Sequence, residues 1–421
     1  MIVGIIGSGG REHALCKSLK NSRKIDKIYC FPGNAGTENI ADNIDADINN
    51  FEKLKNIILE KKIEIVIIGP EKPLVNGLTD YLEKHKIKVF GPSKIASQLE
   101  GSKIFTKKMC EKYNIPTAKF GIYSNKQDAF SFIKNCKYPI VIKADGLAAG
   151  KGVYICENAE SSTVAIEEIF DGKFGEASNI LVEEFLKGEE MSFFIISDGK
   201  TFQKFGTAQD HKRVFEGDKG KNTGGMGAYS PSRLENDELD KKIIEQIINP
   251  TLKGLGDLNS TFKGFLYAGL MILNNEPFLI EYNVRMGDPE CQTILPKLKT
   301  DFAQIIEACV NTNLNSLDIN WHNDKSICIV LCSKGYPDSY KNNIELKLID
   351  KIILKKNEFI FHAGTKKSGN KIFSNGGRVL NFVVRSDSFL DGREKAIKLI
   401  KNIKWENGFF RKDIAYKVID E

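Results

Sequence analysis

The amino-acid sequence predicts a multidomain protein that combines α/β and α+β architecture. Three observations indicate this fold class. The chain has 421 residues, which is more than a single hydrophobic core usually organises. Short apolar runs alternate with helical segments over residues 1–100, as expected for a parallel sheet with right-handed crossovers. After residue 190 the apolar runs are separated by Gly-rich loops, which favours antiparallel strands.

Residues 1–101 are predicted to form an N-terminal parallel α/β domain. The run IVGII (2–6) is the first strand, because it lacks the basic start and cleavage site of a signal peptide and leads into the turn GSGG. A segment with helical spacing follows this turn. The other elements, in chain order, are strands at 27–31, 63–69 and 87–91, and helices at 51–62 and from 70 to about 86.

The rest of the chain is predicted to contain three further units. They are a central domain made of 102–122 and 190–325, a smaller α+β unit at 123–189 inserted into it, and a small C-terminal α+β domain at 326–421. Their main elements are helices at 95–113, 159–170 and 393–403 and strands at 138–144, 152–156 and 179–186. Pro116 favours a boundary after the first of these helices.

Composition and charge narrow the classes of protein. Apolar residues make up 41% of the chain and charged residues 28%, and the net charge of +6 includes no block of like charge. A nucleic-acid surface is therefore unsupported, and no apolar run is long enough to cross a membrane. The nine cysteines form no CxxC pair, which is typical of free thiols in a reducing cytosol. We expect a cytoplasmic monomer that acts on small molecules, not on nucleic acid or membranes.

The stretch KADGLAAGKGV (143–153) has the composition of a phosphate-binding loop. It is not a Walker loop, because Gly146 and Gly150 are one residue too close and Gly152 stands where Ser or Thr would bind magnesium. The loop joins two predicted strands, so its tip can close over a nucleotide while Lys143 reaches a phosphate from the preceding strand. A plain flexible hairpin is the alternative.

The turn GSGGREH (7–13) exposes backbone N–H groups at the start of a predicted helix, where the helix dipole favours anions. Glu12 replaces the third glycine of a dinucleotide motif, and no acid ends the second strand, so NAD binding is disfavoured. A small phosphate monoester fits better, with Arg11 as a bidentate donor. The Gly-rich turn PGNAGT (32–37) reaches the same sheet edge, although ordinary loops would explain both turns.

The stretch LIEYNVRMGDPE (279–290) predicts a metal site. Because side chains two residues apart on a strand share a face, Glu281 and Asn283 point to one side of the sheet, and Ile280 and Tyr282 to the other. A carboxylate and an amide oxygen side by side are hard ligands that suit Mg2+. An amphipathic edge strand would give the same alternation.

Two further polar segments are candidates for substrate binding. Arg285 continues on the face of Glu281, where it can hold a carboxylate or a phosphate, and the following GDPE turn presents Asp288. The aperiodic, Gly-rich stretch 207–231 contains Asp210 and His211. A disordered surface loop is the alternative for this stretch, but long structureless loops inside compact domains are uncommon unless they are functional.

Taken together, these stretches resemble the ATP-grasp superfamily, and within it the ligases of purine biosynthesis that join glycine to 5-phosphoribosylamine. The matching stretches run the length of the chain and include GSGGREHAL, PGNAGT, IVIIGPEKPLVNGL, FGPSKIASQLEGSKIFTK, PIVIKADGLAAGKGV, VEEFLKGEEMSF, QDHKRVFEGDKGKNTGGMGAYSP, EYNVRMGDPE, HAGT, NGGRVL and RKDI. The resemblance implies an ATP-grasp fold for the central domain, with 123–189 as its lid. It also implies that the N-terminal domain receives the sugar phosphate.

The resemblance implies an ATP site between two antiparallel sheets. Lys103 and Lys143 match lysines that neutralise ATP phosphates, backbone groups of Glu183–Leu186 match the hinge that meets adenine, and Glu190 resembles the acceptor of ribose hydroxyls. The implied ATP-binding residues are Lys103, Lys143, Gly146, Gly150, Lys151, Gly152, Glu183, Glu184, Phe185, Leu186 and Glu190.

The same resemblance assigns the metal and the sugar phosphate. Glu281 and Asn283 match the ligands of Mg2+ (or Mn2+), in agreement with the face argument. Leu270 and Met271 stand where relatives often place an acid, so phosphate oxygens are expected to complete the coordination. The residues implied for the sugar phosphate are Gly9, Gly10, Arg11 and Asn34, with Glu71 as a weaker candidate for ribose hydroxyls.

The implied reaction uses glycine, ATP and 5-phosphoribosylamine and passes through glycyl phosphate. Arg285 is the candidate for the glycine carboxylate, and Asp288 or Asp210 for its ammonium group. One alternative is another ATP-grasp carboxylate–amine ligase of purine biosynthesis, against which the QDHKR and NTGGMGAYSP segments argue. The other is a catalytically inactive nucleotide-binding regulator, which intact Lys143 and Glu281 disfavour.

Overall fold

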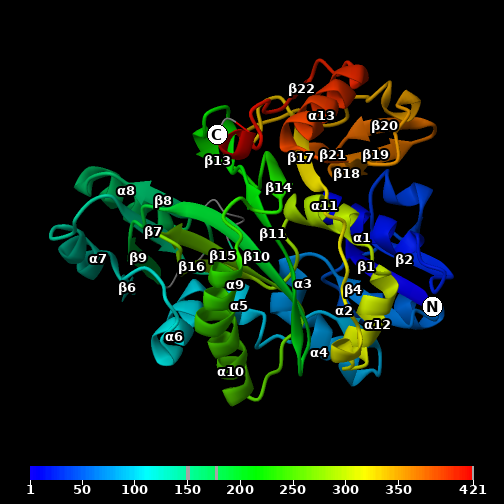
Figure 1. Ribbon diagram of the computed structural model, residues 1–421. Helices are drawn as coiled ribbons and strands as arrows, with labels where there is room; N and C mark the ends of the chain where they lie inside the picture. The colour runs from blue at the N-terminus through cyan, green and yellow to red at the C-terminus, as the bar shows by residue number, and fades with distance from the viewer. Residues whose placement is uncertain (148–151, 176–178, 420–421) are drawn as a thin grey trace.

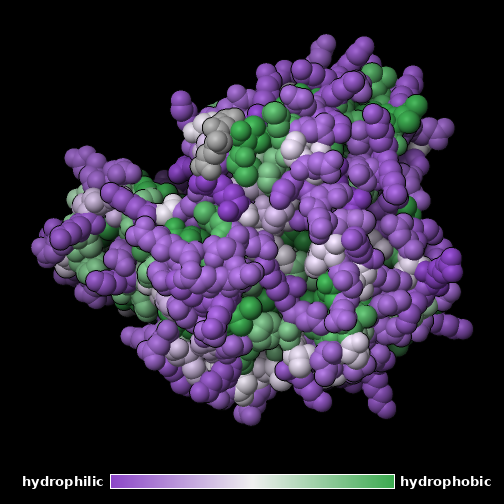
Figure 2. Space-filling view, in the orientation of Figure 1, coloured by the Kyte–Doolittle hydropathy of each residue, from purple (hydrophilic) through white to green (hydrophobic). Residues whose placement is uncertain are grey.

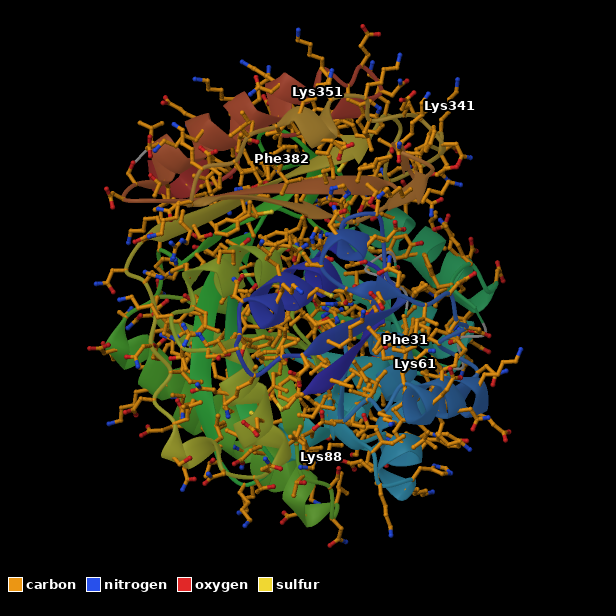
Figure 3. The ribbon with its side chains drawn as sticks, turned by 90° about the vertical axis from the view of Figure 1, so that its right-hand side faces the viewer. Phe31, Lys61, Lys88, Lys341, Lys351 and Phe382 are labelled. Atoms are coloured by element: carbon orange, nitrogen blue, oxygen red, sulfur yellow. The ribbon has the colours of Figure 1, made fainter. Side chains whose placement is uncertain are left out.

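The computed structural model describes residues 1–147, 152–175 and 179–419. The N-terminal unit, in blue, lies beside the C-terminal unit, in orange and red, and the lid projects from the opposite side of a central sheet (Figure 1). Hydrophobic cores fill the units, with Phe31 and Phe382 inside and lysines such as Lys341 pointing outward (Figure 3).

The N-terminal unit is built on a five-stranded parallel sheet with the order β3-β2-β1-β4-β5. Its strands are β1 (Ile2–Gly7), β2 (Lys27–Pro32), β3 (Asp42–Asn43), β4 (Ile65–Ile68) and β5 (Lys88–Phe90). Its helices are α1 (Gly10–Lys20), α2 (Phe51–Glu60), α3 (Glu71–Asn76) and α4 (Leu78–Lys84). Strands such as β4 are buried throughout, as a parallel sheet between helices requires. The predicted fold class of this unit is confirmed.

The lid is a four-stranded antiparallel sheet with the order β6-β9-β7-β8. Its elements are β6 (Phe120–Tyr123), α7 (Lys126–Ile133), β7 (Ile140–Ala144), β8 (Val153–Cys156), α8 (Ala159–Phe170) and β9 (Ile180–Glu184). The two helices pack on the sheet around a hydrophobic core of their own. Because β6 pairs with β9, the lid sheet begins at Phe120, ahead of the boundary predicted at residue 123.

One long sheet joins the central and C-terminal parts of the chain, in the order β16-β15-β10-β11-β14-β17-β21-β18. Its strands are β10 (Glu189–Asp198), β11 (Phe202–Asp210), β14 (Gly227–Ser230), β15 (Lys263–Leu273), β16 (Glu276–Asn283), β17 (Lys325–Ser333), β18 (Glu358–His362) and β21 (Arg378–Ser386), and β22 (Gly408–Phe409) pairs with β17. The C-terminal unit predicted at 326–421 therefore shares its sheet with the central domain. The junction is the antiparallel pairing of Ala228 with Cys328, two residues buried in the core.

The remaining elements of the chain are helices, short turns and two hairpins. The helices are α5 (Gln98–Gly101), α6 (Lys103–Tyr113), α9 (Asp237–Ile243), the π-helical turn η2 (Ile244–Ile248), α10 (Asn249–Asp257), α11 (Glu290–Ile294), α12 (Phe302–Val310), α13 (Phe389–Ile403) and α14 (Tyr416–Ile419). Short 3-10 turns are η1 (Thr37–Asn39), η3 (Leu295–Lys297), η4 (Leu314–Ser316) and η5 (Ile349–Lys351). Two hairpins stand apart, β12 (Arg213–Phe215) with β13 (Lys219–Asn222), and β19 (Thr365–Ser368) with β20 (Lys371–Ser374).

The structure corrects one local prediction, adds one helical segment that was not predicted, and excludes one of the alternatives. The helix predicted at 95–113 is divided at Ser102, whose side chain caps α6 by accepting a hydrogen bond of 3.1 Å from the backbone N–H of Phe105. The helical segment at 237–257 was not predicted. The polar stretch 207–231 is not a disordered loop, because it holds the β12–β13 hairpin and β14.

The surface is mainly hydrophilic and the cysteines are unpaired, as the composition predicts. Hydrophilic residues cover most of the face seen in Figure 2. All nine cysteines are free thiols, and eight of them are buried. Within the described residues, none of the helices is long and apolar enough to span a membrane.

Candidate active site

A cleft of about 650 Å³ lies where the lid, the central sheet and the N-terminal unit meet. Residues from both ends of the chain line it, including Arg11 of α1, Lys143 of β7, Glu281 of β16 and Arg378 of β21. We call the part around Lys143 and Glu281 the lid half, and the part around Arg11 and Arg378 the N-terminal half.

Three lysines approach the lid half of the cleft, and two of them share one carboxylate. The Nζ of Lys143 lies 2.9 Å from Oε2 of Glu183, and the Nζ of Lys107 lies 3.1 Å from Oε1. Lys103 instead donates to the carbonyl of Gly146 over 2.8 Å. Burial would raise the pKa of Glu183, but Lys143 and Lys107 hold it below its ordinary value. At Glu183, therefore, two lysines face a single carboxylate.

The sequence prediction omitted Lys107. Its side chain is almost fully buried, and burial lowers its pKa. The signal for it is the spacing from Lys103, because residues four apart on α6 lie on one face of the helix. Lys107 also donates to Oγ1 of Thr117 over 2.5 Å, so it ties α6 to the chain entering the lid.

The acid and amide of β16 both line the lid half of the cleft. Glu281 lies opposite Gly269 of β15, and Asn283 lies opposite Tyr267. A register shift makes Ile280 an extra residue in the ladder, so Leu279 rather than Ile280 is buried with Tyr282. The predicted pairing of Ile280 with Tyr282 is therefore wrong, and Ile280 lines the cleft beside Glu281.

Two oxygen donors from the protein are too few to enclose a cation. Among the described residues, no cluster of three or more His, Cys, Asp or Glu side chains is arranged to hold a metal ion. Glu281 and Asn283 can supply a carboxylate and an amide oxygen, and both are ligands that suit Mg2+. The donor set thus fits a cation whose other ligands come from phosphate oxygens and water.

The end of β9 and the residues that follow it form another wall of the lid half. Glu184, the last residue of β9, pairs with Ile140 of β7, and it lines the cleft together with the following Phe185 and Leu186. Glu190, at the start of β10, lines it as well, and its Oε2 lies 2.6 Å from the Nζ of Lys212. This ion pair lowers the pKa of Glu190. Lys212 was not among the predicted site residues.

Asp210 lies at the end of β11, where its carboxylate meets other charges. Its Oδ1 is 3.9 Å from the Nζ of Lys212, and its side chain is 9% exposed. Burial together with Glu290 and Glu190 raises the pKa of Asp210 to about 7, although Lys212 opposes the shift. Asp210 can therefore change its charge near neutral pH, which makes it a candidate for binding an amine.

The lid loop contributes Gly146 and Gly152 to the cleft lining. Gly146 has a φ of 94°, a left-handed conformation that glycine adopts without strain. Gly150 and Lys151, which the sequence assigns to ATP, lie outside the described residues.

In the N-terminal half, the start of α1 is already occupied by carboxylates of the protein. The backbone N–H of Gly9 donates to Oε2 of Glu12 over 2.6 Å, and that of Arg11 donates to Oδ2 of Asp288 over 3.2 Å. The Arg11 side chain pairs with Oε1 of Glu12 at 2.6 Å. Donors predicted to hold a phosphate therefore have acceptors within the protein.

Gly10 and Asn34 do not line the cleft, in contrast to the prediction. A Cβ at Gly10 would lie 2.3 Å from Nδ2 of Asn381, so glycine is needed here for close packing between α1 and β21. The Asn34 amide donates to the carbonyls of Ser8 and His362, at 2.8 Å each. Both residues shape the loops behind the cleft rather than its surface.

Arg285 is held by two acids on the N-terminal side of the cleft. Its Nη2 donates to Oε1 of Glu100 over 2.6 Å, and its Nε lies 3.5 Å from Oε2 of Glu71. Burial would raise the pKa of Glu71, but Arg285 and Arg11 lower it. Glu100 was not predicted, although it stands in the matching stretch EGSKIFTK. An anion that binds Arg285 must compete with these carboxylates.

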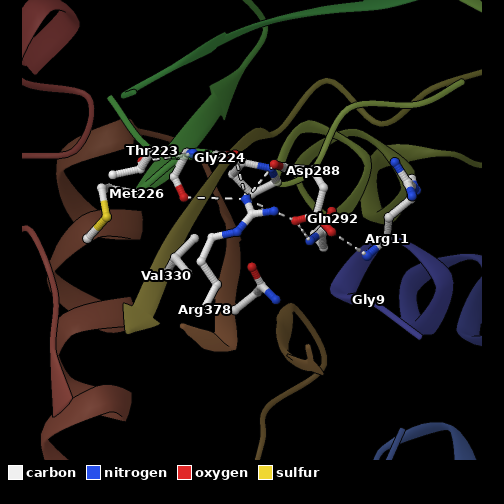
Figure 4. A network of polar contacts seen from close by, with 12 residues as sticks. Gly9, Arg11, Thr223, Gly224, Met226, Asp288, Gln292, Val330 and Arg378 are labelled. Carbon is white, nitrogen blue, oxygen red and sulfur yellow. Dashed lines mark hydrogen bonds and ion pairs between the residues drawn. The ribbon is translucent and has the colours of Figure 1, made fainter. Parts of the chain in front are cut away.

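Arg378 brings the C-terminal unit into the cleft (Figure 4). Its Nη1 donates to the carbonyls of Gly224 and Asp288, at 2.5 Å each, and lies 3.3 Å from Oδ1 of Asp288. Gln292 donates to the same Oδ1 over 2.7 Å. Burial would raise the pKa of Asp288, but Arg378 and Arg11 lower it, so this carboxylate stays ionised. Only the stretch NGGRVL could have indicated Arg378 from the sequence.

The chain matches family models over most of its length. The models described as phosphoribosylglycinamide synthetase N domain, ATP-grasp (A) domain and C domain match residues 1–100, 101–291 and 326–417.

Curated relatives and a solved structure are similar to this chain over nearly its full length. The phosphoribosylamine–glycine ligase of Brucella melitensis is 42% identical over 421 residues, which cover 100% of this chain and 99% of the relative. That of Agrobacterium fabrum is 44% identical over 420 residues with the same coverage. The crystal structure of phosphoribosylamine–glycine ligase from Thermotoga maritima superposes with a TM-score of 0.86 at 32% identity, covering 98% of this chain and 100% of that one.

Proposed function

The chain belongs to the phosphoribosylglycinamide synthetase family, and from that membership we propose which of its residues bind each substrate. It is an ATP-grasp ligase of purine biosynthesis that joins glycine to 5-phosphoribosylamine. The products are glycinamide ribonucleotide, ADP and phosphate. The observation that best supports the assignment below is the acid–amide pair of β16 in the same cleft as the buried lysines of α6 and β7.

ATP binds in the lid half. Lys103 and Lys143 neutralise its phosphates, because both lysines line this part of the cleft. The segment Glu183–Leu186 contacts the adenine. Glu190 accepts hydrogen bonds from the ribose hydroxyls, while Lys212 offsets part of the negative charge of its carboxylate. Gly146 and Gly152, at the two ends of the lid tip, allow the loop to fold over the phosphates.

Glu281 and Asn283 hold a divalent cation, which we propose to be Mg2+, or Mn2+ in its place. When bound, the cation offsets the negative charge of the phosphates and so lets an anionic nucleophile approach them. Glu281 also acts on Lys103 and Lys212, whose ammonium charges it attracts from the same cleft.

Glycine and the ribosylamine occupy the N-terminal half. Arg285 takes the glycine carboxylate by exchanging part of its contact with Glu71, and Asp210 or Asp288 takes the ammonium group. Gly9 and Arg11 approach the sugar phosphate, and Glu71 its ribose hydroxyls. Because the backbone donors there already bind carboxylates, phosphate binding requires Glu12 or Asp288 to release them.

Two displacements complete the reaction. A glycine carboxylate oxygen attacks the γ-phosphorus of ATP, and the bond to the bridging oxygen breaks to give glycyl phosphate and ADP. The ribosylamine nitrogen then attacks the acyl carbon, loses a proton, and expels phosphate with the electron pair of the C–O bond. The lid excludes water, which would otherwise hydrolyse the acyl phosphate.

An isotope experiment tests this pathway. Glycine labelled with 18O in its carboxylate should transfer one labelled oxygen to the released phosphate, because that oxygen bridges carbon and phosphorus in glycyl phosphate. Release of phosphate should require glycine and the ribosylamine together. Unlabelled phosphate from a reaction that forms product would exclude the acyl phosphate, and equal release with other acids would exclude glycine as the substrate.

We also propose that the enzyme is a cytoplasmic monomer. Its nine free thiols suit a reducing compartment. Size-exclusion chromatography with light scattering would test the monomer.

A further inference from the structure

The segment Arg411–Tyr416 packs against the β12–β13 hairpin, although some 190 residues separate them in sequence. The end of the chain lies beside β13 in Figure 1. Arg411 is the largest fully buried side chain, at 1% exposure. Its Nη1 donates to Oδ1 of Asp218 over 2.7 Å and to the carbonyl of Arg213 over 3.0 Å. We call Arg411–Tyr416 the C-terminal clamp.

Asp413 turns this contact into a closed network. Its two carboxylate oxygens accept from Nε and Nη2 of Arg411 at 2.8 and 2.7 Å, the two-point geometry that arginine forms with carboxylates. Oδ2 of Asp413 also accepts from the backbone N–H of Gly217 over 2.8 Å. The hydroxyl of Tyr416 donates to Oδ2 of Asp218 over 2.9 Å. The turn of the hairpin is thus held at Gly217 by Asp413 and at Asp218 by Arg411 and Tyr416.

His211 links the clamp to the base of the hairpin. The backbone N–H of Ala415 donates to its Nε2 over 3.2 Å, so the imidazole acts as an acceptor. Burial and the charge of Arg411 lower the pKa of His211 to about 4, which keeps the ring neutral and able to accept this bond. Its ring also packs against Tyr416. The two neighbours of His211 in the chain are Asp210 and Lys212, and both line the cleft.

The opposite end of the hairpin forms the cleft wall. Thr223 and Gly224 line the cleft. The backbone N–H and the hydroxyl of Thr223 both donate to the carbonyl of Lys212, at 2.8 Å each. These bonds close the base of the hairpin, so a shift of its turn would move Lys212 and Thr223 together. Arg411 itself does not line the cleft.

We infer that the C-terminal clamp positions the cleft wall formed by Lys212, Thr223 and Gly224, and that Arg411 is a positioning residue for the ligase reaction that touches no substrate. This inference rests on the proposed function, because it assigns a role in substrate alignment to Lys212. It also explains why a charged side chain that does not line the cleft is fully buried, although such burial is costly unless the charge is paired.

A double-mutant cycle tests whether Arg411 acts through Lys212. Arg411→Gln should lower kcat/KM for glycine about tenfold in the otherwise unchanged enzyme, but have little further effect in a Lys212→Met background. Equal factors in both backgrounds would overturn the inference, because they would mean that Arg411 only maintains the fold. Asp218→Asn, which keeps size and removes one arm of the network, should repeat the pattern if Arg411→Gln does not fold. If the wild-type enzyme turned over equally fast with another acid in place of glycine, the proposed function rather than the role of Arg411 would be wrong.

Hydrogen exchange gives a readout that does not depend on activity. Arg411→Gln should speed exchange of the backbone N–H groups of Thr223 and Gly225, whose bonds hold the base of the hairpin. Arg385→Gln is the matched control, because Arg385 is also a buried arginine of the C-terminal unit but bonds to Asn357 and lies away from the cleft. Exchange that rises equally in both variants, or in neither, would contradict a positioning role for the clamp.

Discussion

In the lid half of the cleft, Lys107 and Lys143 share the single carboxylate of Glu183, whereas in the N-terminal half each arginine already has a carboxylate partner of its own. Arg11 pairs with Glu12 and Arg378 with Asp288. The difference fits the ligands: ATP is a polyanion, and in the lid half it meets two lysines that share one carboxylate. The smaller substrates enter a region of balanced charge, where binding must rearrange existing pairs. We therefore expect ATP to bind mainly through the lysines of the lid half, and the smaller substrates to bind by replacing existing ion pairs in the N-terminal half.

The largest effect is expected from the metal pair of the lid half. Glu281→Ala should lower kcat at least about a thousandfold, because the cation that offsets phosphate charge loses its carboxylate ligand. Steady-state assays over a range of Mg2+ would measure this loss. Met271→Ala, on the neighbouring strand of the same cleft, is the control that leaves the ligands intact. Activity near that of the wild type at ordinary Mg2+ would remove the metal assignment.

A second comparison separates two lysines that share one acid. Lys143→Met should lower kcat/KM for ATP about a hundredfold, since it removes a charge aimed at the phosphates. Lys107→Met disturbs Glu183 equally but leaves Lys143 in the cleft, so its effect should be several times smaller. Equal losses in the two variants would mean that only the pairing with Glu183 matters.

The N-terminal half should respond mainly through stability. Arg11→Met leaves the buried Glu12 carboxylate unpaired, and the free energy of unfolding should fall by about 3 kcal/mol. Adding Glu12→Gln should recover much of that loss, because both charges are then absent. Denaturant titrations would measure both changes. If Arg11→Met raised the KM for ATP rather than that for the ribosylamine, the division of the cleft into two halves would be wrong.

The smallest effect concerns pH. Asp210 has a pKa raised to about 7, so it is neutral below that pH and ionised above it. If it binds the glycine ammonium, kcat/KM for glycine should rise with pH through about 7, and Asp210→Asn should abolish that rise. The raised pKa also means that ionising Asp210 destabilises the fold, so stability attributed to this group is lost as pH rises through about 7. Asp210→Asn should then be more stable than the wild type at pH 8, by roughly 1 to 3 kcal/mol. A flat pH profile for the wild type would exclude this role.

Local patterns predicted much of the fold and part of the cleft. The period of two along β16 correctly brought Glu281 and Asn283 to one side, but nothing in the sequence reveals the extra residue at Ile280. Short apolar runs also predicted three strands of the lid, β7, β8 and β9, but not β6. The polar stretch 207–231 was harder, because its hairpin bonds to Arg411, which a local sequence pattern cannot relate to it.

Ion pairs within the protein were the other feature that could not be predicted from the sequence. The Gly-rich turn before α1 indicates an anion site, yet Glu12 occupies it from within the same helix, and Asp288 approaches from far along the chain. Donor groups can be counted from a sequence, but their partners depend on tertiary packing.

The most direct test of the account is the affinity of the nucleotide-bound cation. Electron paramagnetic resonance titrations of Mn2+ with ADP would measure it in the wild type, Glu281→Gln and Lys143→Met. The account predicts a tight Mn2+ site in the wild type that Glu281→Gln weakens strongly at saturating ADP, while Lys143→Met changes mainly the affinity for ADP. An unchanged Mn2+ affinity in Glu281→Gln would contradict the claim that the acid–amide pair of β16 holds the cation.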